Sequence, residues 1–199
     1  MGLLEYLIKQ SKKPTGVIGR IMLKIMNNAH KNLFNFGLLN INIDEKCKLL
    51  DLGFGGGNLL KLVSKQYKNV QLFGIDFSEE SIRIASKKNR KDIQNGKIKL
   101  LQADIGKTSF PENYFDIITA FQTHYYWERL PDKISEIYRI LKTNGQFIIV
   151  AEKYKINYHM KGYKTENDIK ELFSNIGYKN IDYKETKNNI CIKGIKILK

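Results

Sequence analysis

A short glycine-rich string stands between a predicted strand and a predicted helix. It reads DLGFGGG from Asp51 to Gly57, after an apolar run at 49–52 and before apolar residues at helical spacing. Glycines in such a turn let the backbone bend sharply and approach a ligand closely, because no Cβ blocks the contact. Asn58 stands where a GxGxxG dinucleotide motif has its third glycine. The string indicates a ligand-binding turn; a turn shaped only for the chain reversal is the alternative.

Acidic residues follow the next two predicted strands. Asp76 lies 19 residues beyond Gly57 at the end of the second strand, and Asp104 follows the third. A carboxylate at the end of the second strand can accept both hydroxyls of a ribose in charge-assisted hydrogen bonds. We expect Asp104 to meet an adenine amino group, with Phe77 or Ile105 on the ring. The pattern predicts a nucleoside site; a helix cap at Asp76 and an ordinary loop acid at Asp104 are the alternatives.

These side chains need a framework of parallel strands to bring them together. From Lys48 onward, short apolar runs alternate with helical periods, which is the pattern of βαβ units and predicts an α/β fold with helices on both faces of the sheet. The predicted strands are 49–52, 70–75, 98–101, 115–120, 147–150, 178–183 and 190–197. Because only residues 187–189 or so separate the last two, we expect an antiparallel hairpin there.

Capping signals mark three of the predicted helices. Ser78 is a favourable N-cap, and Pro131 suits the first turn of a helix that we expect to end at 144–145. Thr165 and Asp168 have the spacing of a capping box. These signals place a helix after each of the second, fourth and fifth strands.

The first 45 residues or so are predicted to be helical. Apolar residues recur on one helical face after a break at Pro14, namely Ile18, Ile21, Met22, Ile25, Met26 and Ala29. The segment is too short for a separate domain, so we expect it to pack on the sheet's edge or to roof the cleft. The prediction is one domain over 1–199, with a helical cap over 1–45 and the core over 46–199.

Four strings, taken in order, resemble a known family. They are LLDLGFGGGNLLKLVSK, LFGIDFSEESI, LLQADIGKTSFPENYFDIITAFQTHYYW and EIYRILKTNGQFIIV, within roughly Lys48 to Glu152. They are similar to class I S-adenosylmethionine-dependent methyltransferases of the ubiquinone/menaquinone-methyltransferase-like (type 11) group. The resemblance implies a Rossmann-like sheet of seven strands in the order 3-2-1-4-5-7-6, with the last strand antiparallel. It also implies S-adenosyl-L-methionine as the cofactor and S-adenosyl-L-homocysteine as its product.

The resemblance also assigns a donor site. The glycines would lie beside the ribose and methionine parts, the two acids would hold ribose and adenine, and the end of the fourth strand would approach the methionine part. The implied donor-binding residues are Asp51, Gly53, Phe54, Gly55, Gly57, Asp76, Phe77, Asp104, Ile105, Phe121 and Gln122. Phe54 stands where the family often has a small residue or cysteine, so we expect it to narrow the donor pocket or to pack against the ligand.

Methyl transfer from a sulfonium makes modest chemical demands, because the cationic sulfur leaves as a neutral thioether without acid or metal. Holding the reactants in line can supply ~7 to 11 kcal/mol. Some protic acceptors need a base, and His124, with an ordinary pKa near ~6.5, follows the fourth strand as a candidate. The alternative is a loop histidine that transfers no proton. Glu152 is a weaker candidate, and Asp116 begins its strand at the wrong edge of the sheet.

Aromatic and polar residues supply candidates for the acceptor pocket. Tyr125, Tyr126 and Trp127 directly follow His124. We expect them to line an aromatic acceptor site or to hold the sulfonium by a cation–π contact; packing of one or two of them in the core is the alternative. Asn27 and His30 on the N-terminal helix either roof the substrate or form the helix's wet side.

Composition restricts the class of protein. No apolar run of 18 residues is present, which argues against a membrane-spanning helix. Cys47 and Cys191 are far apart and lack neighbouring ligands, so we expect no disulfide framework and no metal site. With no secretory signal visible, a cytoplasmic location is predicted. The net charge of +14 favours nucleic acid or anionic surfaces, but the lysines are spread along the chain, as compositional bias would also produce.

Three functions remain open after this reasoning. The favoured one is methylation of a small molecule, because little chain is left for a nucleic-acid module. The others are an RNA or protein methyltransferase that docks its substrate on the basic surface, and a non-catalytic nucleoside-binding subunit. Asn58 and Asp104 argue against a nicotinamide dehydrogenase. A homodimer is compatible with the sequence.

Overall fold

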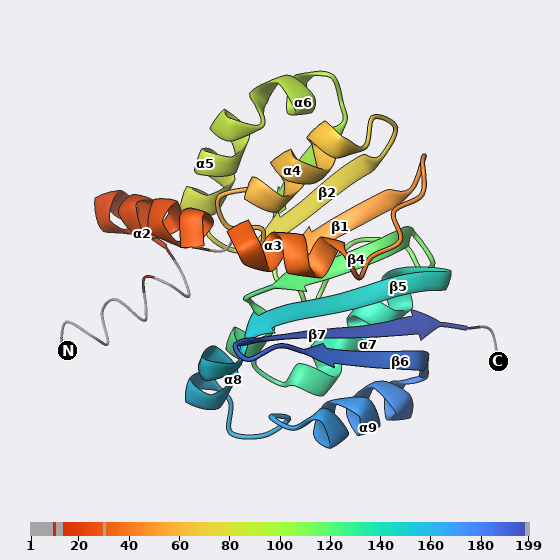
Figure 1. Cartoon of the computed structure of the whole chain (residues 1–199). Coiled ribbons are helices and arrows are strands. Elements are labelled where there is room, and N and C mark those ends of the chain that lie inside the picture. Colours follow the sequence, from red (N-terminus) through yellow and green to blue (C-terminus); the bar gives the residue numbers. More distant parts are fainter. Residues whose placement is uncertain (1–9, 11–13, 30, 198–199) are drawn as a thin grey trace.

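The seven predicted strands form one sheet in the order β3-β2-β1-β4-β5-β7-β6 (Figure 1). The computed structural model describes residue 10 and residues 14–29 and 31–197. The strands are β1 (Lys48–Leu52), β2 (Gln71–Asp76), β3 (Ile98–Gln102), β4 (Phe115–Phe121), β5 (Leu141–Glu152), β6 (Tyr178–Glu185) and β7 (Asn189–Lys196). Only β7 runs antiparallel to its neighbours β5 and β6. The predicted strand order and the antiparallel last strand are confirmed.

Helices cover both faces of this sheet, as predicted (Figure 1). They are α2 (Gly16–Ala29), α3 (Lys31–Leu38), α4 (Asn58–Gln66), α5 (Glu79–Lys88), α6 (Arg90–Gln94), the 3-10 turn η1 (His124–Tyr126), α7 (Leu130–Ile140), α8 (Lys153–His159) and α9 (Glu166–Ile176). Alternate residues of β1 enter opposite cores. Leu50 and Leu52 belong to the core that includes residues of α7 and α9, whereas Leu49 belongs to the core that includes residues of α3 and α4. Strands buried on both faces explain the continuous apolar runs.

Helix α9 begins as its sequence predicts. Thr165 accepts a hydrogen bond from the backbone of Asp168, and the Asp168 carboxylate accepts one from the backbone of Thr165 in return. Ser78 likewise caps α5 by accepting from the backbone of Ser81. Helix α8, by contrast, was not predicted. It begins at Lys153, directly after the last residue of β5, so no turn residues mark its start.

The predicted end of helix α7 is wrong. The helix ends at Ile140, and residues 144–145 lie inside β5 instead. Asn144 has a φ of 62°, and the pairing of β5 with β4 shifts between Phe115 and Ile117. The Asn-Gly pair therefore forms an irregularity of the strand, a role for which the same residue types are suited.

On the N-terminal helix α2, two residues of the predicted inward face are exposed. Ile18 and Ile21, expected to face inward, are 42% and 52% exposed, whereas Gly19 and Leu23 are buried. A Cβ on Gly19 would lie 2.7 Å from the carbonyl carbon of Pro14, so this glycine lets the helix close on the chain that precedes it. In the described part of the chain no helix is both long and apolar enough for a membrane crossing.

Candidate active site

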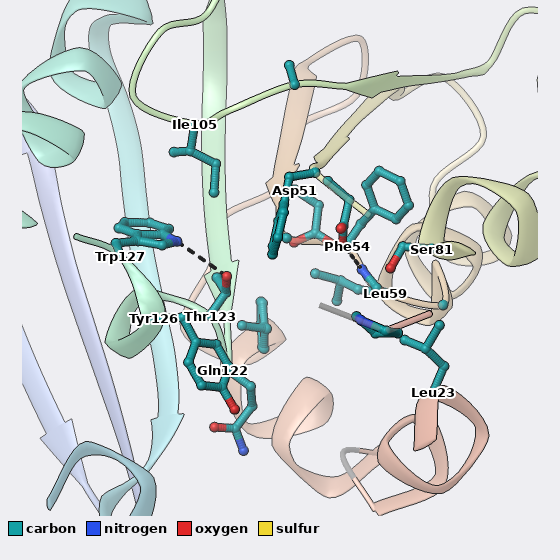
Figure 2. A pocket seen from close by; sticks show the side chains of 18 of the residues that line it. Leu23, Asp51, Phe54, Leu59, Ser81, Ile105, Gln122, Thr123, Tyr126 and Trp127 are labelled. Atoms are coloured by element: carbon teal, nitrogen blue, oxygen red, sulfur yellow. Dashed lines mark hydrogen bonds between the residues drawn. The ribbon is translucent and has the colours of Figure 1, made fainter. Parts of the chain in front are cut away.

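A cavity of about 290 Å³ lies at the carboxyl ends of β1, β2 and β4 (Figure 2). Its walls come from the glycine turn, the loops after β2, β3 and β4, and the N-terminal segment. Loops at this edge of a parallel sheet are the usual place for ligands. The cavity is therefore where the sequence places its predicted site.

The glycine turn leaves room on one side and touches the β4 loop on the other. Gly53 has a φ of 69°, and a Cβ there would overlap Thr123 Oγ1. Gly55 has a φ of 53°, and its nearest neighbour would be Leu23 Cδ2 at 3.5 Å. Gly57, also assigned to the donor site, does not line the cavity; a Cβ on it would lie 2.7 Å from Asn89 Nδ2. Its lack of a side chain serves helix packing.

Asp76 holds the turn and the following helix together. Its Oδ2 accepts from the backbone N–H of Gly55 and its Oδ1 from that of Ser78, both at 2.9 Å. The side chain also lines the cavity, so bracing the helix start and facing a ligand are compatible. Burial raises the pKa of this carboxyl, and the two backbone donors oppose the rise.

Asp51 is the second buried acid on the cavity wall. Burial raises its pKa to about 7, with a further rise from the nearby Asp76 and an opposing hydrogen bond from Thr119. Thr119 Oγ1 donates to Asp51 Oδ1 at 3.0 Å. Two buried carboxylates around one cavity favour a cationic ligand, because a positive charge lowers the cost of ionising them.

Phe54 packs in the core as well as lining the cavity, where Figure 2 shows it beside Asp51. A Cβ on Gly74 of β2 would lie 2.5 Å from Phe54 Cδ1. The absence of a side chain at Gly74 therefore makes room for an aromatic ring in the turn. This contact could not be predicted from the sequence, because nothing in the spacing of Phe54 and Gly74 indicates it.

The predicted adenine end is formed by the loops after β2 and β3. Phe77, Asp104 and Ile105 all line the cavity. Asp104 forms an ion pair with Lys133 of α7, which holds the pKa of the carboxyl below its usual range. The backbone N–H of Gly106 also donates to it at 2.6 Å. Asp104 therefore lines the cavity as part of an ion pair. Its partner, Lys133, was not predicted from the sequence.

The other end of the cavity is largely aromatic. Phe121, Gln122, Tyr126 and Trp127 line it, and Phe34 of α3 packs edge-on against Phe121 with ring centroids 5.5 Å apart. Figure 2 shows Tyr126 and Trp127 on the wall opposite the glycine turn. Trp127 Nε1 donates to Thr123 Oγ1 at 3.3 Å.

The position of His124 does not support its predicted role as a base. It is 1% exposed and does not line the cavity. Burial lowers its pKa to about 3, and within the described structure Nδ1 has no hydrogen-bond partner. An imidazole of this pKa accepts a proton poorly at neutral pH. Tyr125, predicted for the substrate pocket, is also buried behind the wall, stacked on His159 at 5.3 Å.

The N-terminal segment contributes three described residues to the cavity wall. Pro14, Leu23 and Phe34 line it. The side chain of Asn27 and the whole of His30 lie outside the described residues. No sequence signal distinguishes Leu23 from the other apolar residues of α2, because the helix's rotation depends on its packing.

Similarity to known sequences bears on the family. A family model described as a methyltransferase domain, Methyltransf_11, matches residues 50–149. YdaC of Bacillus subtilis, named an uncharacterized methyltransferase, is 26% identical over 128 residues, which are 64% of this chain and 68% of YdaC. Demethylmenaquinone methyltransferase of Bacteroides fragilis is 32% identical over 103 residues, 52% of this chain and 42% of that enzyme. The match thus spans less than half of the menaquinone enzyme.

Solved structures share the fold. A putative S-adenosylmethionine-dependent methyltransferase of Methanococcus maripaludis superposes with a TM-score of 0.73 at 21% identity, over 89% of this chain and 93% of that one. Phosphoethanolamine N-methyltransferase 2 of Haemonchus contortus, in complex with S-adenosyl-L-methionine, gives 0.74 at 15% identity, over 84% and 53% respectively. The family match covers half of the chain, and the sheet order is the one implied by the resemblance. The chain therefore belongs to the Methyltransf_11 family and is a class I S-adenosylmethionine-dependent methyltransferase.

Proposed function

We propose that this protein transfers the methyl group of S-adenosylmethionine to a small, largely apolar acceptor bound against Tyr126 and Trp127. The observation that carries the proposal is the aromatic end of the cavity, where Phe34 and Phe121 also contribute to the wall. Small-molecule sites are typically apolar clefts with a few polar groups. Here the polar groups at that end include the Gln122 amide, the Thr123 hydroxyl and the Glu128 carboxylate.

The cavity residues fit the donor. When bound, S-adenosylmethionine supplies a methyl group on a cationic sulfur. Asp76 would accept the ribose hydroxyls, since a carboxylate has acceptor sites left beyond its two backbone donors. Asp51 would face the positively charged methionine end, and Phe77 with Ile105 would enclose adenine. Gly55 would let the backbone approach, because no side chain projects there.

Catalysis would rest mainly on alignment. The aromatic wall would orient the acceptor, and the roof from Leu23 and Phe34 would limit water around the reacting atoms. Since His124 is buried behind the wall, we assign it no proton transfer. An acceptor that loses its proton readily, or a nucleophile without one, suits this site best.

The test is methyl transfer from labelled donor to a panel of small aromatic and aliphatic acceptors, with bulk RNA and protein as competing substrates. We expect turnover of a small acceptor, with less than twofold change between low and physiological salt. Trp127→Ala should lower turnover at least tenfold, whereas Tyr158→Ala, at an exposed position on α8, should not.

The net charge of +14 supports the second candidate, an RNA or protein acceptor. RNA methylation would fall steeply with salt, because counterions are released on binding. Turnover of RNA alone with that salt dependence would contradict the small-molecule proposal. Binding of the donor without turnover of any acceptor would favour a non-catalytic subunit.

We also propose that the chain works as one domain in a reducing cytoplasm, as a monomer or homodimer. Cys47 and Cys191 are both buried free thiols, and burial raises the pKa of each, to about 11 and about 12. Such thiols react slowly. Mass measurement of the protein from cells, with and without reductant, would test for oxidised cysteines.

A further inference from the structure

The residue that ends the wall of β4 has an unusual backbone. Gln122 has a φ of 57°, and it is the one residue among the described non-glycine positions of positive φ that lines the cavity. Residues other than glycine adopt this left-handed region of backbone conformation at a cost in energy. The backbone N–H of Gln122 donates to Val150 O at 2.9 Å, which holds one side of the residue. The side chain needs its own restraint.

Glu152, at the end of β5, supplies that restraint at both ends of the amide. Its backbone N–H donates to Gln122 Oε1 at 3.1 Å, and its Oε2 accepts from Gln122 Nε2. The hydroxyl of Tyr125 also donates to Gln122 Oε1, at 3.1 Å. Reversing the amide would turn its NH₂ toward two donors and its oxygen toward a carboxylate. The contacts therefore define one orientation of a side chain that is 4% exposed.

This restraint reaches the acceptor wall. Tyr125, held by the Gln122 amide, packs against Tyr126 with ring centroids 4.6 Å apart. Figure 2 shows Tyr126 and Gln122 together on the wall of the cavity. Glu152 itself does not line the cavity and is tied to Lys155 at 3.1 Å. Glu152, outside the cavity, thus holds Gln122 of the wall directly and Tyr126 of the wall through Tyr125.

We propose that Glu152 is a positioning residue that sets the Gln122 amide and, through Tyr125, the aromatic wall beside the transferred methyl group. The proposal rests on the proposed function, because it assumes that donor and acceptor meet at this wall. It predicts that the hydrogen-bonding capacity of residue 152, rather than its charge, determines the shape of the site.

Two variants separate these properties. Glu152→Gln keeps an oxygen that accepts from Gln122 Nε2, whereas Glu152→Leu keeps the approximate size and removes that acceptor. The measurements are calorimetric binding of S-adenosyl-L-homocysteine and the emission spectrum of Trp127, the single tryptophan of the chain, which lies in the cavity wall. We expect Glu152→Leu to weaken binding about tenfold and to shift the emission, and Glu152→Gln to stay within about twofold of the natural protein.

Asp116→Leu is the matched control. The Asp116 side chain is 34% exposed against 29% for Glu152, and it accepts from the backbone of Lys48 and from Lys142 at the opposite edge of the sheet. This variant should lower the melting temperature without changing binding or emission. Unchanged binding in Glu152→Leu, equal losses in Glu152→Gln and Glu152→Leu, or an equal loss in Asp116→Leu would each overturn the proposal. Failure of the natural protein to bind the ligand would instead overturn the donor site.

Discussion

At the scale of single residues, burial decides which titratable groups are useful in the cavity. His124 and Asp51 are both buried, at 1% and 2% exposure, and desolvation shifts both away from their charged forms. His124 then has a pKa too low for a base at neutral pH, whereas Asp51 has a pKa of about 7 and titrates in the physiological range. Asp51, the acid of the glycine turn, is therefore a pH-sensitive group of the site.

Asp51 makes donor binding depend on pH. Since its pKa is raised to about 7 in the folded protein, the carboxyl is mostly protonated below that pH and ionised above it. A cationic donor prefers the ionised form, so affinity should rise through pH 7, by about tenfold between pH 6 and pH 8. Titration calorimetry at several pH values measures this.

Asp51→Asn is the control for that profile. The variant should bind the donor more weakly, and its affinity should depend little on pH, because an asparagine side chain does not titrate. Any pH dependence that comes from the ligand itself is the same for both proteins. A natural protein whose profile matches that of the variant would show that Asp51 does not face the donor.

At the scale of elements, α2 acts as a roof through one buried side chain. Leu23 is 3% exposed and lines the cavity, whereas Ile21, one half-turn away, is 52% exposed. The prediction was wrong at Ile18 and Ile21, because hydrophobic periodicity alone does not include the packing of α2 against α5 and α3. Helix α2 thus contributes to the site by its packing against α5 and α3.

Shortening Leu23 should weaken the roof. Leu23→Ala removes a buried side chain, with an expected loss of about 2 to 5 kcal/mol in unfolding free energy if the site does not collapse. We also expect S-adenosylhomocysteine to bind several-fold more weakly. Ile21→Ala, on the exposed face, should change both by little. Thermal unfolding and calorimetry measure the two effects, and equal results for both variants would refute the roof.

At the scale of the whole molecule, the site and much of the core are separate. The cavity lies at the carboxyl ends of β1, β2 and β4, while the half of the sheet formed by β5, β7 and β6 packs against α9. A Cβ on Gly194 of β7 would lie 2.7 Å from Phe173 and 3.0 Å from Tyr178, both fully buried. Neither ring lines the cavity.

Gly194→Ala should therefore affect stability and spare the site. Overpacking of this kind typically costs about 1 to 3 kcal/mol, which should appear as a lower melting temperature. S-adenosylhomocysteine affinity should stay within twofold. Gly162→Ala, where no atom lies within 4 Å of the new Cβ, should leave both unchanged. A loss of affinity in folded Gly194→Ala would show that the two regions are coupled.

The strands could be predicted from sequence patterns, as could the turn and the acids that end β1, β2 and β3. Apolar runs, caps such as Thr165 with Asp168, and the motif at 51–57 are local patterns, and local patterns are present in the chain before it folds. The order of strands came through the family resemblance. These parts of the prediction agree with the structure.

The directions of individual side chains, by contrast, followed from the tertiary structure. It buried His124 behind the wall, paired Asp104 with Lys133, and turned Leu23 rather than Ile21 toward the cavity. Each outcome depends on residues distant in the chain, whose positions follow from close packing and desolvation rather than from spacing. For the same reason, the hydrogen bonds between Glu152 and Gln122 could not be predicted from the sequence, because they depend on the pairing of β4 with β5.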